Sequence, residues 1–353
     1  MAILTLADGL PLQTTHEQKD IVWLDAACTE NIRIFGAAET QPRYRRLPQW
    51  LEPELRQELV ELGRHSSGIR ARFRTNSPYI ALHVQWDAQY LHTKLRDGMR
   101  SFDLFSFHGG KQAFEHFFPL PLQPEHTQDY CYTTCADLRE YLLNWPLYNK
   151  VFKVYIGLQA GSVLEAGGAY HNDLPVVFYG SSITQGAYAC RPGNSYQNFL
   201  SRALDMDYIN LGFSGNGRGD PVLVDYMATI PMACFVSDYD HNAPTEEHLE
   251  KTHFDVYRRI REKNPELPYI MISKPDYRPT DCIRRSIVME SYQKALAAGD
   301  KNVYFLDGAA FFTGVERDAC TFDGVHPNDL GLYRMAEGMV HVLRCILYGG
   351  GLY

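Results

Sequence analysis

The chain has 353 residues, of which 45% are hydrophobic and 22% charged, and its formal net charge is −8. This length allows two domains with separate cores, and this composition is typical of a globular protein rather than a disordered one. The negative net charge disfavours a nucleic-acid-binding protein, whose contact surface would be basic.

The first half of the chain predicts short strands separated by turns. The alternating runs 69–74 and 79–84 flank Asn76-Ser77-Pro78, and this pattern favours a β-hairpin. A short helix with a proline near its start is expected over residues 53–62. Further strands are expected at 21–24, 32–34, 102–107 and 151–158. Many short strands with frequent turns are typical of a β-sandwich, here expected to be jelly-roll-like and to cover residues 1–168.

The second half alternates strand-like and helix-like runs and predicts an α/β domain over residues 169–353. Apolar strands are expected at 176–179, 208–211, 234–237, 269–273 and 303–306. Helices are expected at 195–204, 221–228, 245–263, 284–298 and 330–347. This rhythm indicates a parallel sheet with helices on both faces.

Polar residues follow several of these strands, and loops after parallel strands meet at one edge of the sheet. Ser182 follows the first strand, glycine-rich residues 213–219 follow the second, and Asp238 to Pro244 follow the third. Asp323 and His326 form a D-x-x-H pair after the last strand. Together they supply a nucleophile, a base and an orienting carboxylate for acyl transfer. The alternative is an ordinary polar loop with serines that cap a helix and an aspartate that caps a turn.

Four blocks of this half resemble the SGNH (GDSL-type) hydrolase superfamily. They are Gly180-Ser181-Ser182-Ile183-Thr184, Gly215 in Phe-Ser-Gly-Asn, Asn242, and Asp323-x-x-His326. The resemblance covers roughly residues 170–347. It implies a flavodoxin-like three-layer α/β/α fold with sheet order 2-1-3-4-5. The first half, in residues 68–77, 101–109 and 145–158, is similar to the β-sandwich that precedes this domain in one subgroup.

The resemblance also assigns roles. Ser182 becomes the nucleophile, His326 the base and Asp323 the third member of a catalytic triad. The backbone N–H groups of Ser182 and Gly215 and the side chain of Asn242 form the oxyanion hole. Two positions depart from the usual pattern. Ser181 replaces the commonest aspartate, and the third block reads Asp240-His241-Asn242-Ala243 instead of Gly-x-Asn-Asp.

The substrate expected from this subgroup is a small acylated molecule, a saccharide above all. Arg191, Arg218, Asp238 and Asp240 are the polar side chains predicted to bind its hydroxyls. The predicted reaction is the hydrolysis of a short acyl ester, most of all an acetyl ester. Acyl transfer to another acceptor and a catalytically silent sugar-binding protein are the alternatives.

Other binding partners are not expected. Neither a metal nor a cofactor is predicted, because the histidines lack ligand spacing and the glycine-rich loop lacks the lysine of a phosphate-binding loop. A cytoplasmic location is expected, since residues 1–20 show no signal-peptide pattern and no apolar run approaches the ~20 residues that span a bilayer. The 8 cysteines lack C-x-x-C spacing and fit reduced thiols. No nucleic-acid or membrane partner is expected, and a homo-oligomer is left open.

Overall fold

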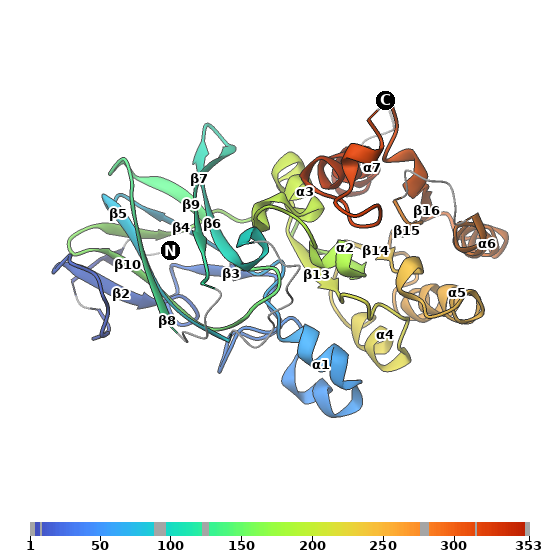
Figure 1. Cartoon of the computed structure of the whole chain (residues 1–353), viewed down its shortest axis with the longest axis horizontal. Coiled ribbons are helices and arrows are strands. Elements are labelled where there is room, and N and C mark those ends of the chain that lie inside the picture. Colours follow the sequence, from blue (N-terminus) through green and yellow to red (C-terminus); the bar gives the residue numbers. More distant parts are fainter. Residues whose placement is uncertain are drawn as a thin grey trace. The chain divides into compact units, whose positions relative to one another are not determined.

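The computed structural model of the chain describes residues 4–7, 9–87, 97–121, 127–275, 282–314 and 316–349. The chain folds into two compact units, which Figure 1 colours by sequence. The first unit comprises Met1–Gln49, Arg64–Ala169 and Arg191–Gly193, and the second comprises Trp50–Gly63, Tyr170–Cys190 and Asn194–Tyr353. Among the described residues, no helix combines the length and apolarity required to cross a bilayer.

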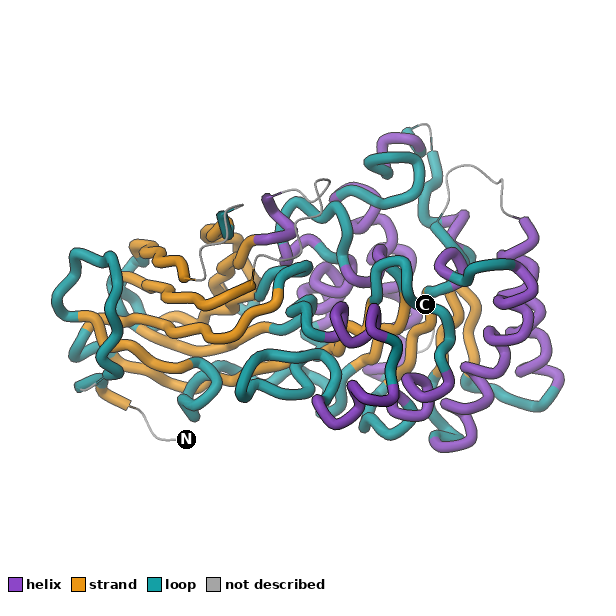
Figure 2. The backbone as a smooth tube through the Cα atoms, turned by 60° about the horizontal axis from the view of Figure 1, so that its bottom comes forward, coloured by secondary structure: helices purple, strands orange, loops and turns teal. Residues whose placement is uncertain are grey.

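The first unit is built from two antiparallel sheets, whose strands are orange in Figure 2. The larger sheet has the order β1-β11-β4-β9-β6-β7, with β3 paired to β4, and the smaller has the order β2-β10-β5-β8. Its strands are β1 (Leu4–Thr5), β2 (Ile21–Asp25), β3 (Arg33–Phe35), β4 (Arg70–Thr75), β5 (Tyr79–Asp87), β6 (Ser101–His108), β7 (Lys111–Pro119), β8 (Thr127–Thr133), β9 (Arg139–Asn144), β10 (Lys150–Gln159) and β11 (Val163–Ala166). A short 3-10 helix, η2 (Asp97–Arg100), precedes β6.

The predicted hairpin between residues 69–74 and 79–84 is wrong. Both runs form strands, but β4 lies in the larger sheet and β5 in the smaller one. β4 pairs with β9 and β11, whereas β5 pairs with β8 and β10. Alternation shows that a strand has one face toward a core, and this condition is met equally by a hairpin and by two strands that face each other across a sandwich.

One apolar core fills the space between the two sheets. Side chains from both sheets contribute to it, including Phe73 and Leu104 from the larger sheet and Leu82 and Val154 from the smaller one. Trp86 and Trp145 are its largest members, and each is almost fully buried. Many of the aromatic residues of this half therefore stabilise the sandwich rather than line a cleft.

The second unit is a three-layer α/β/α domain with a five-stranded parallel sheet. The strand order is β13-β12-β14-β15-β16, the 2-1-3-4-5 order that the resemblance to SGNH hydrolases implies. Its strands are β12 (Val176–Gly180), β13 (Tyr208–Gly212), β14 (Cys234–Asp238), β15 (Tyr269–Ile272) and β16 (Val303–Leu306). Its helices are α1 (Gln57–Gly63), α2 (Ser182–Gln185), α3 (Tyr196–Leu204), α4 (Pro221–Met227), α5 (Glu246–Lys263), α6 (Cys282–Ala297) and α7 (Asp329–Tyr348). Short 3-10 turns of this unit are η4 (Asp240–Asn242), η5 (Gly308–Ala310) and η6 (Asp318–Cys320), whereas η1 (Gln49–Glu54) and η3 (Pro192–Asn194) each contain residues of both units.

The helices cover both faces of this sheet. Figure 1 shows α3 beside α7 on one face, and α4, α5 and α6 in succession on the other. The strands β12 and β14 are buried along their whole length, as continuous apolar runs in a parallel sheet require. The carboxyl edge of this sheet is therefore the place where polar loops emerge.

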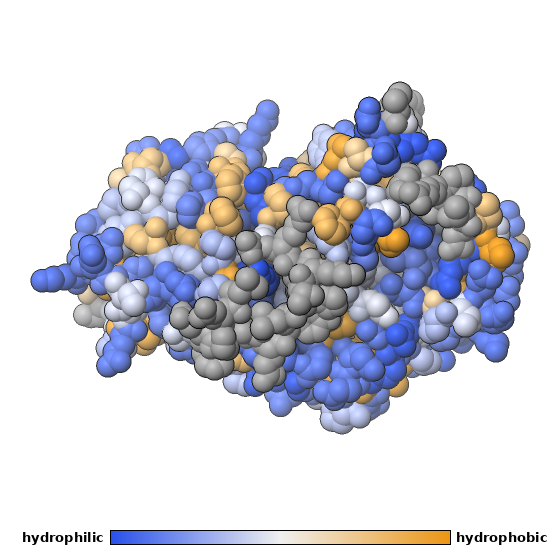
Figure 3. Space-filling view, viewed as in Figure 1, coloured by the Kyte–Doolittle hydropathy of each residue, from blue (hydrophilic) through white to orange (hydrophobic). Residues whose placement is uncertain are grey.

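The face of the molecule in Figure 3 is mainly hydrophilic, and apolar residues lie on it in small separate groups. Exposed large apolar side chains such as Trp50 and Leu174 are scattered through the chain. Single exposed apolar residues are normal on protein surfaces and do not by themselves indicate a partner.

Candidate active site

The central strands of the second unit end in register. Gly180 of β12 is paired with Gly212 of β13 and with Asp238 of β14. A Cβ atom on Gly180 would lie 2.0 Å from the Thr184 hydroxyl and 2.3 Å from the Asp238 carbonyl oxygen, so only glycine fits there. The three loops that follow these strands therefore start side by side at the carboxyl edge of the sheet.

Ser182 is the first residue of α2, which follows β12 directly. Ser181 is the N-cap, and its hydroxyl accepts the Ile183 N–H at 3.1 Å. The helix ends after four residues at Gly186, whose φ of 99° is left-handed. Ser182 is 5% exposed, and its Oγ lies 3.0 Å from Nε2 of His326.

His326 is held by the turn that precedes α7. Asp323 Oδ2 lies 2.9 Å from the ring Nδ1, and Asp323 Oδ1 accepts the backbone N–H groups of Val325 and His326. Partial burial acts to raise the pKa of Asp323, but the bonds from His326 and Val325 outweigh it and hold this pKa below its ordinary value. An ionised Asp323 accepts the Nδ1 proton and leaves Nε2 free to accept the Ser182 proton. We call Ser182, His326 and Asp323 the exposed triad.

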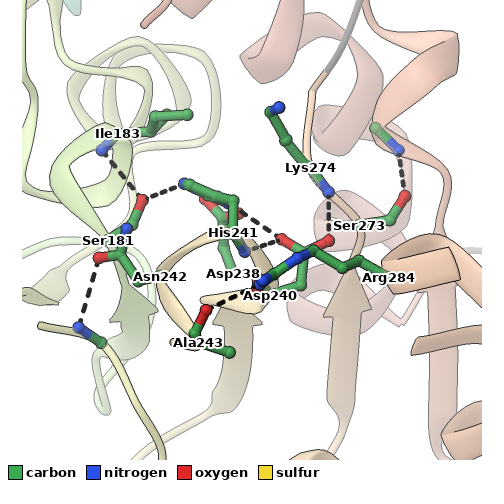
Figure 4. Close-up of polar contacts among 12 residues, drawn as sticks. Ser181, Ile183, Asp238, Asp240, His241, Asn242, Ala243, Ser273, Lys274 and Arg284 are labelled. Carbon is green, nitrogen blue, oxygen red and sulfur yellow. Dashed lines mark hydrogen bonds and ion pairs between the residues drawn. The ribbon is translucent and has the colours of Figure 1, made fainter. Parts of the chain in front are cut away.

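The predicted oxyanion-hole residues lie in the loops after β13 and β14. Gly215 is exposed, has a φ of +69°, and its N–H has no acceptor within the described part of the chain. Asn242 ends η4, and its Oδ1 accepts the Gly217 N–H at 3.4 Å (Figure 4). This bond orients the carboxamide, so the donor Nδ2 faces away from Gly217.

Arg56 supports the loop that carries Gly215, and nothing in the local sequence predicts this role. Its guanidinium contacts both carboxylate oxygens of Asp220, at 2.6 and 3.0 Å. It also donates to the side chain and carbonyl of Asn216. Such a bidentate pair is both strong and geometrically specific. The sequence could not predict this contact because 160 residues separate Arg56 from Asn216.

The four predicted substrate-binding side chains have different surroundings. Arg218 folds back on its own loop and donates to the Gly215 carbonyl with Nε and Nη2. Arg191 belongs to the first unit, where its guanidinium carbon lies 3.9 Å from the ring centroid of Phe114. Asp238 and Asp240 are 0% and 1% exposed, so a substrate hydroxyl cannot reach them in this structure. We therefore correct the expectation for these two aspartates: they are interior groups.

A second hydrogen-bonded series includes Ser181, the residue before Ser182 (Figure 4). His241 Nε2 lies 2.5 Å from the Ser181 hydroxyl, and His241 Nδ1 lies 2.9 Å from Oδ1 of Asp240. The side chains of His241 and Asp240 are 7% and 1% exposed, against 26% and 36% for His326 and Asp323. We call Ser181, His241 and Asp240 the buried triad. The sequence contained its residues but gave no reason to join them.

Asp238, Asp240 and His241 also form a group whose potential metal-ligand atoms lie within 4.8 Å of one another. Both nitrogens of His241 already bond within the buried triad, and both Asp240 oxygens accept hydrogen bonds. Asp238 Oδ2 accepts the Thr184 hydroxyl, which leaves Oδ1 as the one oxygen without a partner in this group. These contacts describe a hydrogen-bonded network, and we assign no metal to it.

Two aromatic rings stand next to His326. The Tyr188 ring lies 5.1 Å from the His326 ring and stacks on Phe322 at 4.4 Å. Tyr188 has a φ of +65°, a conformation that is uncommon for a residue other than glycine. Backbone strain of this kind often marks functional sites. Phe322 is 47% exposed, so this aromatic pair reaches solvent.

Two family models match the chain. A GDSL-like lipase/acylhydrolase family matches residues 173–344, and the N-terminal domain of SGNH hydrolase-type esterases matches residues 21–164. The two matches together cover both units and most of the chain. The chain therefore belongs to the SGNH hydrolases of the GDSL type, and it is an esterase or acylhydrolase by class.

Solved structures agree with this membership. A protein described as a GDSL-like lipase from Bacteroides ovatus is 27% identical, with a TM-score of 0.82 over 93% of this chain and 98% of that one. A salicylyl-acyltransferase from a tetracycline biosynthetic pathway is 19% identical, with a TM-score of 0.73 over 91% and 96%. An acetyl xylan esterase from Butyrivibrio proteoclasticus is 14% identical, with a TM-score of 0.59 over 93% and 99%. At these last two identities the likeness concerns the fold alone. A comparison with curated proteins found no match to this chain.

Proposed function

We propose that the protein is a serine esterase that removes short acyl groups, acetyl above all, from a carbohydrate or a related small polyol. The observation that carries this proposal is the hydrogen-bonded exposed triad at the carboxyl edge of the sheet. The likeness of the fold to an acetyl xylan esterase supports the acetyl and saccharide part.

The mechanism follows from the contacts of the exposed triad. His326 Nε2 accepts the proton of Ser182 Oγ as this oxygen attacks the acyl carbon. The oxyanion that forms is held by the Ser182 and Gly215 N–H groups and the Asn242 amide. His326 then gives its proton to the leaving alcohol oxygen. In the second step His326 accepts a proton from water as the water attacks the acyl carbon, and it returns this proton to Ser182 Oγ as the acid leaves.

This proton transfer determines which part of the substrate lies beside His326. The leaving oxygen must approach Nε2, so the alcohol half of the ester lies on the His326 side. Tyr188 and Phe322 are the aromatic rings on that side. An aromatic face suits the apolar C–H face of a pyranose, and it makes a saccharide the favoured leaving group.

Labelling of the nucleophile tests the acyl-enzyme. A serine-directed phosphonate is expected to add one adduct, which peptide mass spectrometry should place on Ser182. An adduct on Ser181, or a protein that hydrolyses esters without forming any adduct, would contradict the proposed nucleophile.

A substrate comparison tests the acyl group and the alcohol. We expect 4-nitrophenyl acetate to turn over faster than the butyrate and octanoate esters, and acetylated oligosaccharides to release acetate. Faster turnover of octanoate, or no acetate from any acetylated sugar, would contradict an acetyl esterase. Adding alcohols or sugars as competing acceptors tests the acyltransferase alternative, because transfer would divert the acyl group from water.

The aromatic pair has its own test. Phe322→Ala is expected to raise KM for an acetylated saccharide about fivefold to tenfold, the equivalent of ~1 kcal/mol of ring contact. KM for ethyl acetate, whose leaving group has no ring, should change less than twofold. The matched control is Phe199→Ala, since Phe199 pairs with Tyr333 elsewhere in the second unit. Equal changes for both substrates would contradict a sugar contact.

A further inference from the structure

The buried triad connects the two residues next to the proposed catalytic groups. Ser181 immediately precedes Ser182, and His241 immediately precedes Asn242. The 2.5 Å contact between the Ser181 hydroxyl and His241 Nε2 therefore links the start of α2, which carries Ser182, directly to the η4 turn, which carries Asn242 (Figure 4). In sequence these two turns are 60 residues apart.

The histidine end of this link is anchored from several sides. Asp240 Oδ1 accepts both the ring Nδ1–H and the backbone N–H of His241, and Asp240 Oδ2 accepts the Lys274 N–H at 2.9 Å. Arg284 reaches from α6 and donates to the carbonyl oxygens of Asp240 and Ala243 (Figure 4). The η4 turn is therefore fixed to two other elements of the unit.

The serine end is anchored by the start of α2. The Ser181 hydroxyl accepts the Ile183 N–H, and the Ser181 carbonyl oxygen accepts the Gln185 N–H at 2.9 Å. Since Asp240 can only accept, Nδ1 of His241 carries a proton, and in the neutral ring Nε2 accepts the Ser181 O–H. Every polar atom of this link then has a partner, as a buried network requires.

We propose that His241 is a positioning residue that holds Asn242 at a fixed place relative to Ser182. The inference rests on the proposed function, because it assumes that Ser182 attacks and that Asn242 donates to the oxyanion. Oxyanion donors act only when they lie within hydrogen-bond distance of the developing charge, so a small displacement of Asn242 costs rate rather than substrate binding.

Two variants of His241 separate the two halves of the link. The carboxamide of Gln reaches the position of Nε2 and keeps the contact with Ser181, whereas that of Asn reaches Nδ1 and keeps the contact with Asp240. We expect His241→Gln to keep kcat within about threefold while the melting temperature falls, because a buried carboxylate loses a donor. His241→Asn should lower kcat about tenfold with KM little changed, and the melting temperature should fall less.

Combination with Asn242→Ala tests the route of the effect. Asn242→Ala alone should lower kcat about 10²–10³-fold, the usual cost of one oxyanion donor. If His241 acts through Asn242, adding His241→Asn to Asn242→Ala should change kcat less than about twofold. Multiplication of the two losses would overturn the proposal.

His253→Asn is the matched control. His253 is also buried in this unit and stacks on Tyr239 at 5.5 Å, and it bonds to neither Ser181 nor Asn242. It should lose stability and keep kcat. A kcat that follows the melting temperature across all these variants, or a wild-type kcat in His241→Asn, would overturn the inference. Full activity in Ser182→Ala would instead overturn the proposed function itself.

Discussion

The second unit contains two Ser–His–Asp series whose serines are neighbours in sequence. Their hydrogen bonds are alike: each histidine contacts a carboxylate through Nδ1 and a serine hydroxyl through Nε2. They differ in surroundings. The histidine and aspartate of the exposed triad are open to solvent by 26% and 36%, and those of the buried triad by 7% and 1%.

This difference teaches that a hydrogen-bonded triad is not by itself an active site. Ser181 is fully buried, and its hydroxyl already accepts a helix N–H. Ser182 is itself only 5% exposed, but the side chain of His326, which it contacts, is 26% exposed, and the Gly215 N–H has no acceptor in the described part of the chain. Under the proposed function, the exposure of the histidine and aspartate and the oxyanion donors assign the chemistry to the exposed triad, and the buried triad holds the structure.

The largest expected effect comes from removing each serine in turn. Ser182→Ala should lower kcat about 10⁴-fold or more, because the acyl-enzyme cannot form. Ser181→Ala should keep much of the activity, within about tenfold of wild type. Steady-state rates with 4-nitrophenyl acetate measure both, and comparable losses in the two variants would erase the distinction between the triads.

The two aspartates should differ in whether their replacement mainly lowers kcat or mainly lowers the unfolding free energy. Asp323→Asn is expected to lower kcat about 10²–10⁴-fold with little change in stability, because the carboxylate sets the His326 tautomer at a half-exposed position. Asp240→Asn should instead cost about 2–4 kcal/mol of unfolding free energy, since a buried charged acceptor loses its bonds, and kcat should fall about tenfold.

Activity and urea unfolding measured together test this contrast. Circular dichroism provides the control that each variant is folded at the assay temperature. A destabilised Asp323→Asn that retains full turnover would contradict the assignment of the exposed triad.

The smallest expected effect is a pH dependence of the unfolding free energy, which arises from Asp238 next to the buried triad. Burial raises the pKa of Asp238 to about 6, with His241 opposing and Asp240 adding to this shift. The folded state therefore favours the protonated carboxyl. The contribution of the protonated carboxyl to the unfolding free energy is fully present below the unfolded pKa of about 3.8. It is lost as pH rises to about 6 and beyond.

Asp238→Asn removes this titration. The unfolding free energy of the variant relative to wild type should rise by about 2.4 kcal/mol between pH 4 and pH 8. Urea unfolding at both pH values measures it, and Asp137→Asn, at an exposed position of the first unit, is the control. A difference that stays constant or falls with rising pH would show that folding does not raise the pKa of Asp238.

Much of the fold could be predicted because its signals are local. Each buried parallel strand is a short apolar run, and the helices α3, α5 and α7 carry an apolar face at a 3.6-residue period, so all five strands and the long helices match their predicted places. The pairing of β4 and β5 could not be predicted. Their partners lie far along the chain, and alternation does not identify them.

The site divides along the same line. Ser182 and the Asp323–His326 pair were readable because they lie in short motifs after predicted strands. The partners of His241 and Arg56 were not, since each is fixed by a turn that only the folded sheet brings near. The burial of Asp238 and Asp240 could not be predicted either, because polar residues after a strand can point inward as well as outward.

Neither compact unit is one continuous piece of chain. The β-sandwich includes residues 191–193 from the middle of the hydrolase region, and the α/β domain includes residues 50–63 with Arg56. A single cut near residue 169 would leave the glycine loop without the guanidinium that pairs with Asp220. Recombination between genes can exchange modules only at points that leave each module whole. For this chain no single crossover point does so, because each unit includes a segment from the other half of the sequence.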